Sequence, residues 1–561
     1  MIHPRLHAAL IGAAAACAVL VNLGGPALWD DDEPKNAACS LAMLDSGDWV
    51  VPTFNGRLRV EKPPLANWVQ MAGFSLCGRN ETGARLGSAL LTIGSCLVTW
   101  RIGCSLVGSA GGFLGGLVMA TCIWTAVGGR AATPDAPLVF CTTLALWLFV
   151  RGGGGSAERI SAGSAAAIGA ACGLAALAKG PVGIALPVGA FLLFTAWQWQ
   201  TGIVATAASA ADRLRLPVIV GTALAVALPW YASVGFRTEG EWLRGFFLVH
   251  NVGRFTTPME GHSGSILYYP CVIAAGLFPW SLVLLAMLAH TATILRPRSR
   301  HRRRPGVALL ASWTLAWVGA FSCSGTKLPG YIWPAYPALA LLTALFLTDW
   351  SRGAITFTNL WPDPAFARIA VMRTAWATLA AVGLALTVGL AFAAQLLAPG
   401  NAWLGIIGLV PTAGAAVAWR HEAAGDAGRA IRAVAVTACL LVSLLAGLAA
   451  ERFSAAQGMR ESVTALAADA PAPWACFWNV PPSVVFYAHT TVAKLDTPED
   501  VARHLAGHPQ ARVVIDSRHE PLVRDTLPPG CTVLARIPTF DERHYLVLGP
   551  PPRDAALALA P

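Results

Sequence analysis

The chain has 561 residues, of which 55% are hydrophobic and only 12% are charged, about half the roughly 25% of a soluble domain. This composition excludes an ordinary cytosolic enzyme, because too few polar side chains are present to cover a soluble surface. It also excludes a disordered chain, whose signature is low hydrophobicity. The net charge of +10 must therefore be read against a membrane, and no nucleic-acid partner is expected. We predict a polytopic α-helical membrane protein.

Membrane-spanning helices need about 20 mostly apolar residues, and about thirteen segments satisfy this condition. These segments are 7–25, 84–104, 108–128, 135–151, 162–179, 181–198, 215–234, 268–292, 306–323, 332–349, 374–397, 402–419 and 432–450. The first segment lacks a small-residue cleavage site followed by a soluble domain. We therefore expect it to be retained and not removed as a signal peptide.

Arginine and lysine indicate the orientation, because short cytoplasmic loops accumulate them. The densest run, from Arg296 to Arg304, lies between the eighth and ninth segments. With this run inside, the N-terminus is expected in the cytoplasm and, after an odd number of spans, the C-terminus in the periplasm. We predict a multi-pass protein of the bacterial inner membrane, with the loops 26–83 and 235–267 on the periplasmic face.

The composition changes near residue 452, where Asp, Glu, His and Pro return. Short apolar runs then alternate with a helical stretch near 498–505. We predict a membrane domain over 1–451 and a small periplasmic α/β domain over 452–561. The cysteines show no CxxC spacing, so no zinc site is expected. Four of them lie on the oxidising side, where disulfides form, and the sequence does not pair them: Cys39, Cys77, Cys476 and Cys531.

The first periplasmic loop is the richest in ionisable residues. Asp30, Asp31, Asp32 and Glu33 follow one another directly after the first segment, and such a run repels itself unless cations or a metal lie nearby. The sequence requires no cofactor. A divalent cation, if one binds, is expected at Asp32 and Glu61.

Other periplasmic segments bring further ionisable groups to the same level. Lys179 is the most informative, because a lysine between two apolar segments on the outer side is costly. Cations that converge on one outer cavity would form an anion site suited to a phosphate. Two carboxylates nearby could serve as a base and an orienting acid. This arrangement predicts group transfer from a phosphate-linked lipid at the membrane surface.

Several motifs, in this order along the chain, resemble the aminoarabinose transferase-like glycosyltransferases, a family related to the protein O-mannosyltransferases. The similar segments are Asp32-Glu33-Pro34-Lys35, Leu44 to Pro52, Glu61-Lys62-Pro63-Pro64-Leu65, Thr133-Pro134-Asp135, Ala178-Lys179-Gly180-Pro181, His250 to Phe255 and Lys327 to Tyr331. The resemblance extends over roughly residues 5–350. It implies a GT-C fold and an inverting transfer of a sugar from a polyprenyl-phosphate donor to a lipid A-like or other envelope acceptor. The leading candidate for the sugar is 4-amino-4-deoxy-L-arabinose.

The resemblance also implies roles for particular residues. Asp32 and Asp135 are the expected catalytic carboxylates. The groups expected to bind the donor phosphate are Lys35, Lys62, Lys179, Arg254, Lys327 and Tyr331, and the expected supporting residues are Glu33, Glu61 and His250. Lys35 stands where the aminoarabinose enzymes carry arginine, a change that keeps the charge but loses the bidentate fork.

Two other functions remain open from the sequence. A protein O-mannosyltransferase-like enzyme would perform the same chemistry on a protein acceptor. A transporter or flippase of polyprenyl-linked sugars would use ionisable groups at the membrane midplane and an internal inverted repeat, and neither is visible. Each site residue also has a simpler explanation: Asp30 and Asp31 as a solvated loop edge, and Lys179 as an interfacial anchor.

Overall fold

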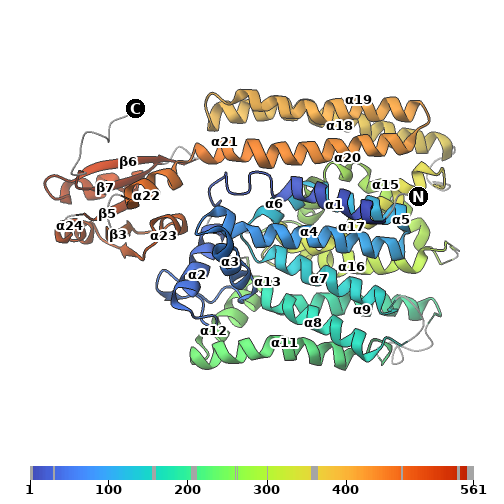
Figure 1. Ribbon diagram of the computed structural model, residues 1–561, viewed down its shortest axis with the longest axis horizontal. Helices are drawn as coiled ribbons and strands as arrows, with labels where there is room; N and C mark the ends of the chain where they lie inside the picture. The colour runs from blue at the N-terminus through green and yellow to red at the C-terminus, as the bar shows by residue number, and fades with distance from the viewer. Residues whose placement is uncertain are drawn as a thin grey trace.

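The computed structural model describes residues 4–29, 32–154, 159–203, 212–258, 261, 263–297, 299, 301–355, 364–468, 472–508, 510–539 and 544–551. The helices run side by side in one elongated bundle, with a β-sheet region at one end (Figure 1). The first helix, α1 (Pro4–Val19), begins near the end of the bundle that lies away from the sheet region (Figure 1). The length and apolar composition of its helices show that the chain is a multi-pass integral membrane protein.

Nine helices of the described part are long and apolar enough to cross a membrane, or ten if one bent pair is counted as a span. The nine are α4 (Glu81–Leu106), α8 (Ala162–Lys179), α9 (Val182–Gln200), α11 (Leu216–Arg237), α16 (Arg304–Ser322), η3 with α17 (Pro329–Ser351), α18 (Pro364–Leu397, apolar from Ile369), η4 with α19 (Ala402–Ala423) and α20 with η5 and α21 (Ala427–Ala455). Each corresponds to one of the predicted segments.

Of the thirteen predicted spans, nine or ten are supported by helix length and composition in the described part of the chain, because the other four segments form short or broken helices. The segment 7–25 is the 16-residue helix α1 (Pro4–Val19), and 135–151 is the 17-residue helix α7 (Asp135–Arg151). The segment 108–128 forms α5 (Ser109–Thr121) and α6 (Ile123–Arg130), which meet at 59°. The segment 268–292 is divided into α14 (Tyr268–Gly276), η2 (Trp280–Val283) and α15 (Leu284–Leu295). Pro279 lies at that break and has no N–H to continue a helix.

The first outer loop folds into short elements at the end of the bundle that faces the sheet region (Figure 1). They are α2 (Asp32–Ser46), the hairpin strands β1 (Thr53–Phe54) and β2 (Arg57–Leu58), and α3 (Leu65–Cys77). At the same end lie α12 (Glu241–Arg244), the π-helix η1 (Gly245–Gly253) and α13 (Arg254–Thr256). The two predicted outer loops therefore lie at one end of the molecule.

The C-terminal region, defined here as residues 450–551, contains the predicted mixed α/β structure. Its five-stranded sheet has the order β4-β3-β5-β7-β6, with β4, β3 and β5 parallel and β7 antiparallel to both neighbours. The strands are β3 (Trp474–Phe477), β4 (Val492–Leu495), β5 (Arg512–Asp516), β6 (Thr532–Pro538) and β7 (His544–Gly549). The accompanying helices are α22 (Met459–Ala468), α23 (Pro482–Ala488), α24 (Pro498–Gly507), η6 (Ser517–His519), α25 (Glu520–Val523) and η7 (Arg524–Thr526). Cys476 and Cys531 are free, as are Cys39 and Cys77 in the first outer loop.

Helices α4 and α5 approach each other closely through glycines. A methyl group added at Gly112 would lie 2.5 Å from the backbone nitrogen of Cys104 and 2.9 Å from the carbonyl carbon of Gly103. No room for a side chain exists at this contact, so the two backbones pack directly, as small residues allow in membranes.

We expect Gly112→Ala to lower the free energy of unfolding by roughly 1–3 kcal/mol, the usual cost of overpacking. The measurement is thermal or denaturant unfolding of the detergent-solubilised protein. Gly189→Ala in α9 is the matched control, because no atom lies within 4 Å of the added methyl group. Equal stability of the two variants would contradict the close α4–α5 contact.

Candidate functional site

Glu61 is held by two cations in the loop after the β1–β2 hairpin. Its carboxylate accepts from Lys35 Nζ at 2.7 Å and from Arg59 Nε at 3.0 Å. Arg59 is buried and also donates to Asn36 Oδ1 at 2.7 Å. Burial raises the pKa of Glu61, but Arg59 and Lys35 outweigh it and lower the pKa to about 2. Glu61 is therefore a fixed anion that ties the hairpin to α2, and Lys35 is its partner.

Of the two residues expected to bind a divalent cation, Glu61 already has cationic partners. Both oxygens of Glu61 accept from cations. Among the described residues, no group of three or more His, Cys, Asp or Glu side chains is placed to hold a metal. Asp32 is exposed at the start of α2, and Asp30 and Asp31 lie outside the described residues.

Lys62 is the residue around which the other predicted groups gather. It is half-buried and directly follows Glu61. Burial lowers its pKa to about 8, with the positive charges of Lys179 and Arg254 acting in the same direction and the carboxylates of Asp32 and Asp135 opposing them. Four residues from distant parts of the chain therefore act electrostatically on one ammonium group.

The cations next to Lys62 are placed by the ends of helices. Asp135 is the first residue of α7, Lys179 is the last residue of α8, and the two form an ion pair. The ammonium group of Lys179 also lies 5.0 Å from the centre of the Tyr331 ring, and Arg254 Nη1 lies 3.4 Å from Tyr331 Oη. Tyr331 thus contacts both cations.

The segments that carry Arg254 and Lys327 are joined by backbone hydrogen bonds. Gly325 N donates to Phe255 O at 2.8 Å, and Thr326 N donates to Arg254 O at 3.1 Å. Lys327 is buried, and its ammonium group donates to the carbonyls of Ser322 and Ser324 at 3.0 and 2.6 Å. The structure therefore gives Lys327 a place in holding this turn. His250 lies half-buried in η1, four residues before Arg254.

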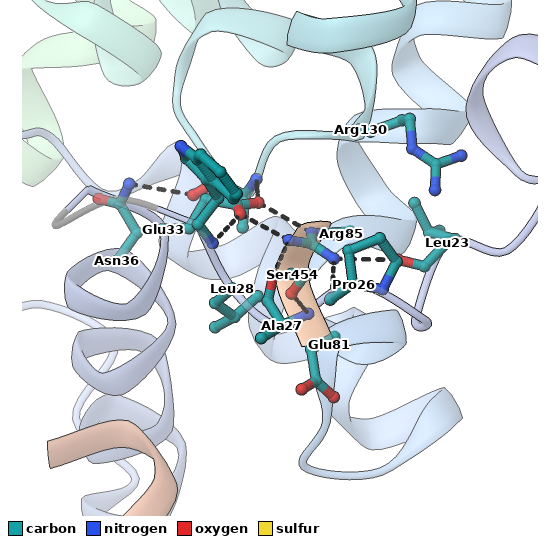
Figure 2. A network of polar contacts seen from close by, with 12 residues as sticks. Leu23, Pro26, Ala27, Leu28, Glu33, Asn36, Glu81, Arg85, Arg130 and Ser454 are labelled. Atoms are coloured by element: carbon teal, nitrogen blue, oxygen red, sulfur yellow. Dashed lines mark hydrogen bonds and ion pairs between the residues drawn. The ribbon is translucent and has the colours of Figure 1, made fainter. Parts of the chain in front are cut away.

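Glu33, next to Asp32, is buried in a polar network (Figure 2). It accepts from Arg85 Nε and Nη2 at 2.9 and 2.6 Å, from the backbone nitrogen of Ala132 at 2.7 Å and from that of Trp29 at 2.6 Å. The Glu33–Arg85 pair fixes the start of α2 against α4, and the bond from Ala132 fixes it against the turn between α6 and α7. Glu33 is thereby a supporting residue that leaves its exposed neighbour Asp32 available.

Arg59 and Arg85, the two buried arginines that hold these carboxylates, were not predicted from the sequence. Arg85 lies in the first turn of α4, inside the predicted segment 84–104, where an arginine is expensive without a partner. The energetic cost of an arginine in an apolar segment was the sequence feature that could have indicated a buried partner for Arg85. Arg57 lies on β2 and Arg59 directly follows that strand, and the sequence gives no sign of which of the two arginines is buried.

The geometry has a definite chemical capability. Two carboxylates, Asp32 and Asp135, lie with Lys62, Lys179 and Arg254 at the end of the bundle next to the outer loops. The cations can stabilise charge that develops on a phosphate leaving group, usually the largest contribution to catalysis. An exposed carboxylate beside them can accept or orient a proton.

The chain is similar in sequence to several known proteins. Residues 61–229 match the family described as dolichyl-phosphate-mannose-protein mannosyltransferase. An uncharacterised protein of Aquifex aeolicus is 31% identical over 319 residues, which cover 56% of this chain and 67% of that protein. The undecaprenyl phosphate-alpha-4-amino-4-deoxy-L-arabinose arabinosyl transferase of Edwardsiella ictaluri is 32% identical over 329 residues, 58% of this chain. That match spans only 56% of the length of the transferase.

Solved structures show the same fold. The ArnT of Cupriavidus metallidurans bound to undecaprenyl phosphate superposes with a TM-score of 0.74 at 24% identity and covers 99% of both chains. The oligosaccharyltransferase of Archaeoglobus fulgidus in its apo form gives a TM-score of 0.51 at 12% identity, over 92% of this chain and 70% of that one.

The chain therefore shares its fold with the ArnT and oligosaccharyltransferase structures. By its sequence relatives it belongs to the ArnT-like family of membrane glycosyltransferases, which is related to the protein mannosyltransferases. The predicted family is thereby confirmed, and so is the predicted polytopic helical membrane fold with a small C-terminal α/β region.

We expect Glu33→Ala to reduce the free energy of unfolding by about 3–5 kcal/mol, because it leaves the Arg85 charge buried without its partner. Thermal unfolding in detergent measures this loss. Asp45→Ala is the control, since the Asp45–Arg79 pair is about half exposed and should contribute about 0–1 kcal/mol. A Glu33 variant as stable as the Asp45 variant would refute the structural role of the pair.

Proposed function

We propose that this protein transfers a sugar from a polyprenyl-phosphate donor to an envelope acceptor on the periplasmic face, with inversion at the anomeric carbon. The observation that carries the proposal is the convergence of Lys62, Lys179 and Arg254 beside Asp32 and Asp135. The ArnT structure that shares this fold holds undecaprenyl phosphate. The lipid A-like acceptor and 4-amino-4-deoxy-L-arabinose are the candidates that the named relatives favour.

In the proposed reaction an oxygen of the acceptor attacks the anomeric carbon from the face opposite the phosphate. The new carbon–oxygen bond forms as the bond to the phosphate oxygen breaks, and the electron pair stays on the polyprenyl phosphate. Asp32 receives the proton of the attacking hydroxyl or orients it. Lys62, Lys179 and Arg254 stabilise the charge on the departing phosphate. Asp135 holds Lys179 in position through their ion pair.

The deciding experiment incubates the purified full-length protein with radiolabelled polyprenyl-phosphate sugars and with lipid or protein acceptors. Release of free polyprenyl phosphate together with labelled acceptor supports the proposal. A labelled protein acceptor in place of a lipid would favour the mannosyltransferase-like alternative, to which the family match over 61–229 points. Movement of intact sugar-lipid across vesicles without transfer would instead establish a flippase.

Asp32→Asn should lower the transfer rate by roughly 10²–10⁴-fold, the usual contribution of a positioned acid or base. Lys179→Ala should lower it by roughly ten- to hundredfold, the value of a hydrogen bond to a charged group. Initial rates at saturating donor measure both. Asp496→Asn and Lys494→Ala are matched controls, since that pair lies exposed on the C-terminal region. Loss of activity in the controls, or none in the site variants, would contradict the assignment.

The pH dependence should reflect Lys62, whose pKa is lowered to about 8. Its ammonium group is charged below that pH and becomes neutral above it, so kcat/KM for the donor should fall as the pH rises through about 8. Lys62→Arg should remove this alkaline limb, because arginine stays charged. Lys494→Arg makes the same change on an exposed lysine and should leave the profile unaltered. An alkaline limb that persists in Lys62→Arg would show that another group titrates.

A further inference from the structure

The C-terminal region contacts both arms of the first outer loop. One arm is the segment 20–29, which leads from α1 to Asp32. The other arm is the hairpin 53–58, which leads to Glu61 and Lys62. The sequence of the predicted α/β domain contains no recognisable catalytic motif. Its connection with the candidate site is through these contacts.

The segment 20–29 is held from the membrane side by two arginines (Figure 2). Arg85 donates to the carbonyls of Leu23, Pro26 and Ala27 at 3.1, 2.6 and 2.7 Å. Arg130 is buried and donates to the carbonyls of Val21 and Asn22 at 2.6 and 2.8 Å. The carbonyls that follow the end of α1 are thus satisfied by side chains of α4 and α6.

The same segment is held from the other side by the C-terminal region. Ser454 Oγ accepts from Ala27 N at 2.8 Å, and Tyr487 Oη accepts from Leu28 N at 2.8 Å. Arg460 Nη1 donates to Gly25 O at 2.7 Å. These donors and acceptors come from α21, α22 and α23, so three separate helices bind three residues of the segment: Gly25, Ala27 and Leu28.

Tyr487 connects this grip to the membrane helices. It is buried, and its hydroxyl donates to Glu81 Oε1 at 3.1 Å, at the start of α4. Glu81 also accepts from Arg460 at 3.4 Å. Burial raises the pKa of Tyr487, so its hydroxyl keeps the proton that it donates. Arg85, which holds Glu33, lies one helical turn further along α4.

The second arm is fixed independently. Asn55, at the tip of the hairpin, donates through Nδ2 to Val492 O at 2.8 Å and accepts through Oδ1 from Val492 N at 2.7 Å. Val492 begins β4 of the sheet. The Asn55 side chain therefore continues the hydrogen bonding of the sheet's edge strand, and the hairpin is tied to the same body as segment 20–29.

We propose that the C-terminal region is a positioning element of the candidate site, which through Tyr487 and Asn55 holds the two arms that carry Asp32 and Lys62. This inference rests on the proposed function. The region sets the distance between the proposed base and the phosphate-binding cation. Since misplacement by about 1 Å can cost 10²-fold in rate, loosening either arm slows the chemical step without removing any group that touches the substrate.

Two variants test the proposal in the full-length protein. Tyr487→Phe removes the hydroxyl that joins Leu28 to Glu81. Asn55→Gly removes the bonds to Val492 while keeping the positive φ of 52° that this position requires. Thr526→Val is the matched control, because its hydroxyl donates only within the C-terminal region, to Pro498 O and Val523 O.

Three measurements apply to each variant: kcat and KM for the donor, binding of undecaprenyl phosphate, and hydrogen exchange of peptides over 20–35 and 50–62. We expect a roughly ten- to hundredfold fall in kcat with little change in KM or in undecaprenyl phosphate binding. Exchange should become faster in peptide 20–35 for Tyr487→Phe and in peptide 50–62 for Asn55→Gly. The Thr526 variant should match the wild type.

Unchanged kcat and exchange in both variants would overturn the proposal. So would faster exchange spread evenly over the chain in both, which would indicate general loosening. If the wild type transfers sugar from no polyprenyl-phosphate donor, the proposed function fails. The exchange data alone then decide whether the region holds the two arms.

Discussion

The arrangement of the outer end depends on the buried pairing of Glu33 with Arg85. The pair brings the start of α2 against α4 and lets Arg85 satisfy three carbonyls of the segment before it. Such a pair is costly to form, because both ions leave water, and it persists only when further hydrogen bonds satisfy it. Here the backbone of Trp29 and of Ala132 supplies them. The exposed Asp32 inherits its position from this buried neighbour.

Around that fixed start, the site divides its charges into two kinds. Glu61, Lys35 and Arg59 satisfy one another and serve as structure. The charge of Lys62 is instead disfavoured, first by burial and then by Lys179 and Arg254, while Asp32 and Asp135 favour it. This ammonium group therefore differs from its neighbours, whose charges are paired within the structure.

The sequence predicted the class of fold and the membership of the outer cluster better than the count of spans. Hydropathy identified every long helix, because each needs an apolar stretch. It did not show that Pro279 and the bend between α5 and α6 interrupt apolar segments that look continuous in the sequence. The engagement of Lys35 by Glu61 and of Lys327 by the carbonyls of Ser322 and Ser324 could not be predicted. Which lysine has a partner depends on contacts between residues far apart in the chain, such as Arg59 with Asn36.

The ion pair of Asp135 and Lys179 has a polarity that its two residues alone do not reveal. Asp135 begins α7 and Lys179 ends α8. A helix carries a partial positive charge at its first turn and a partial negative charge at its last. Each side chain therefore occupies the helix end that favours its sign. Exchanging the two residues would keep the pair but reverse both alignments, so the pair has a direction, and the cation is presented by the end of α8.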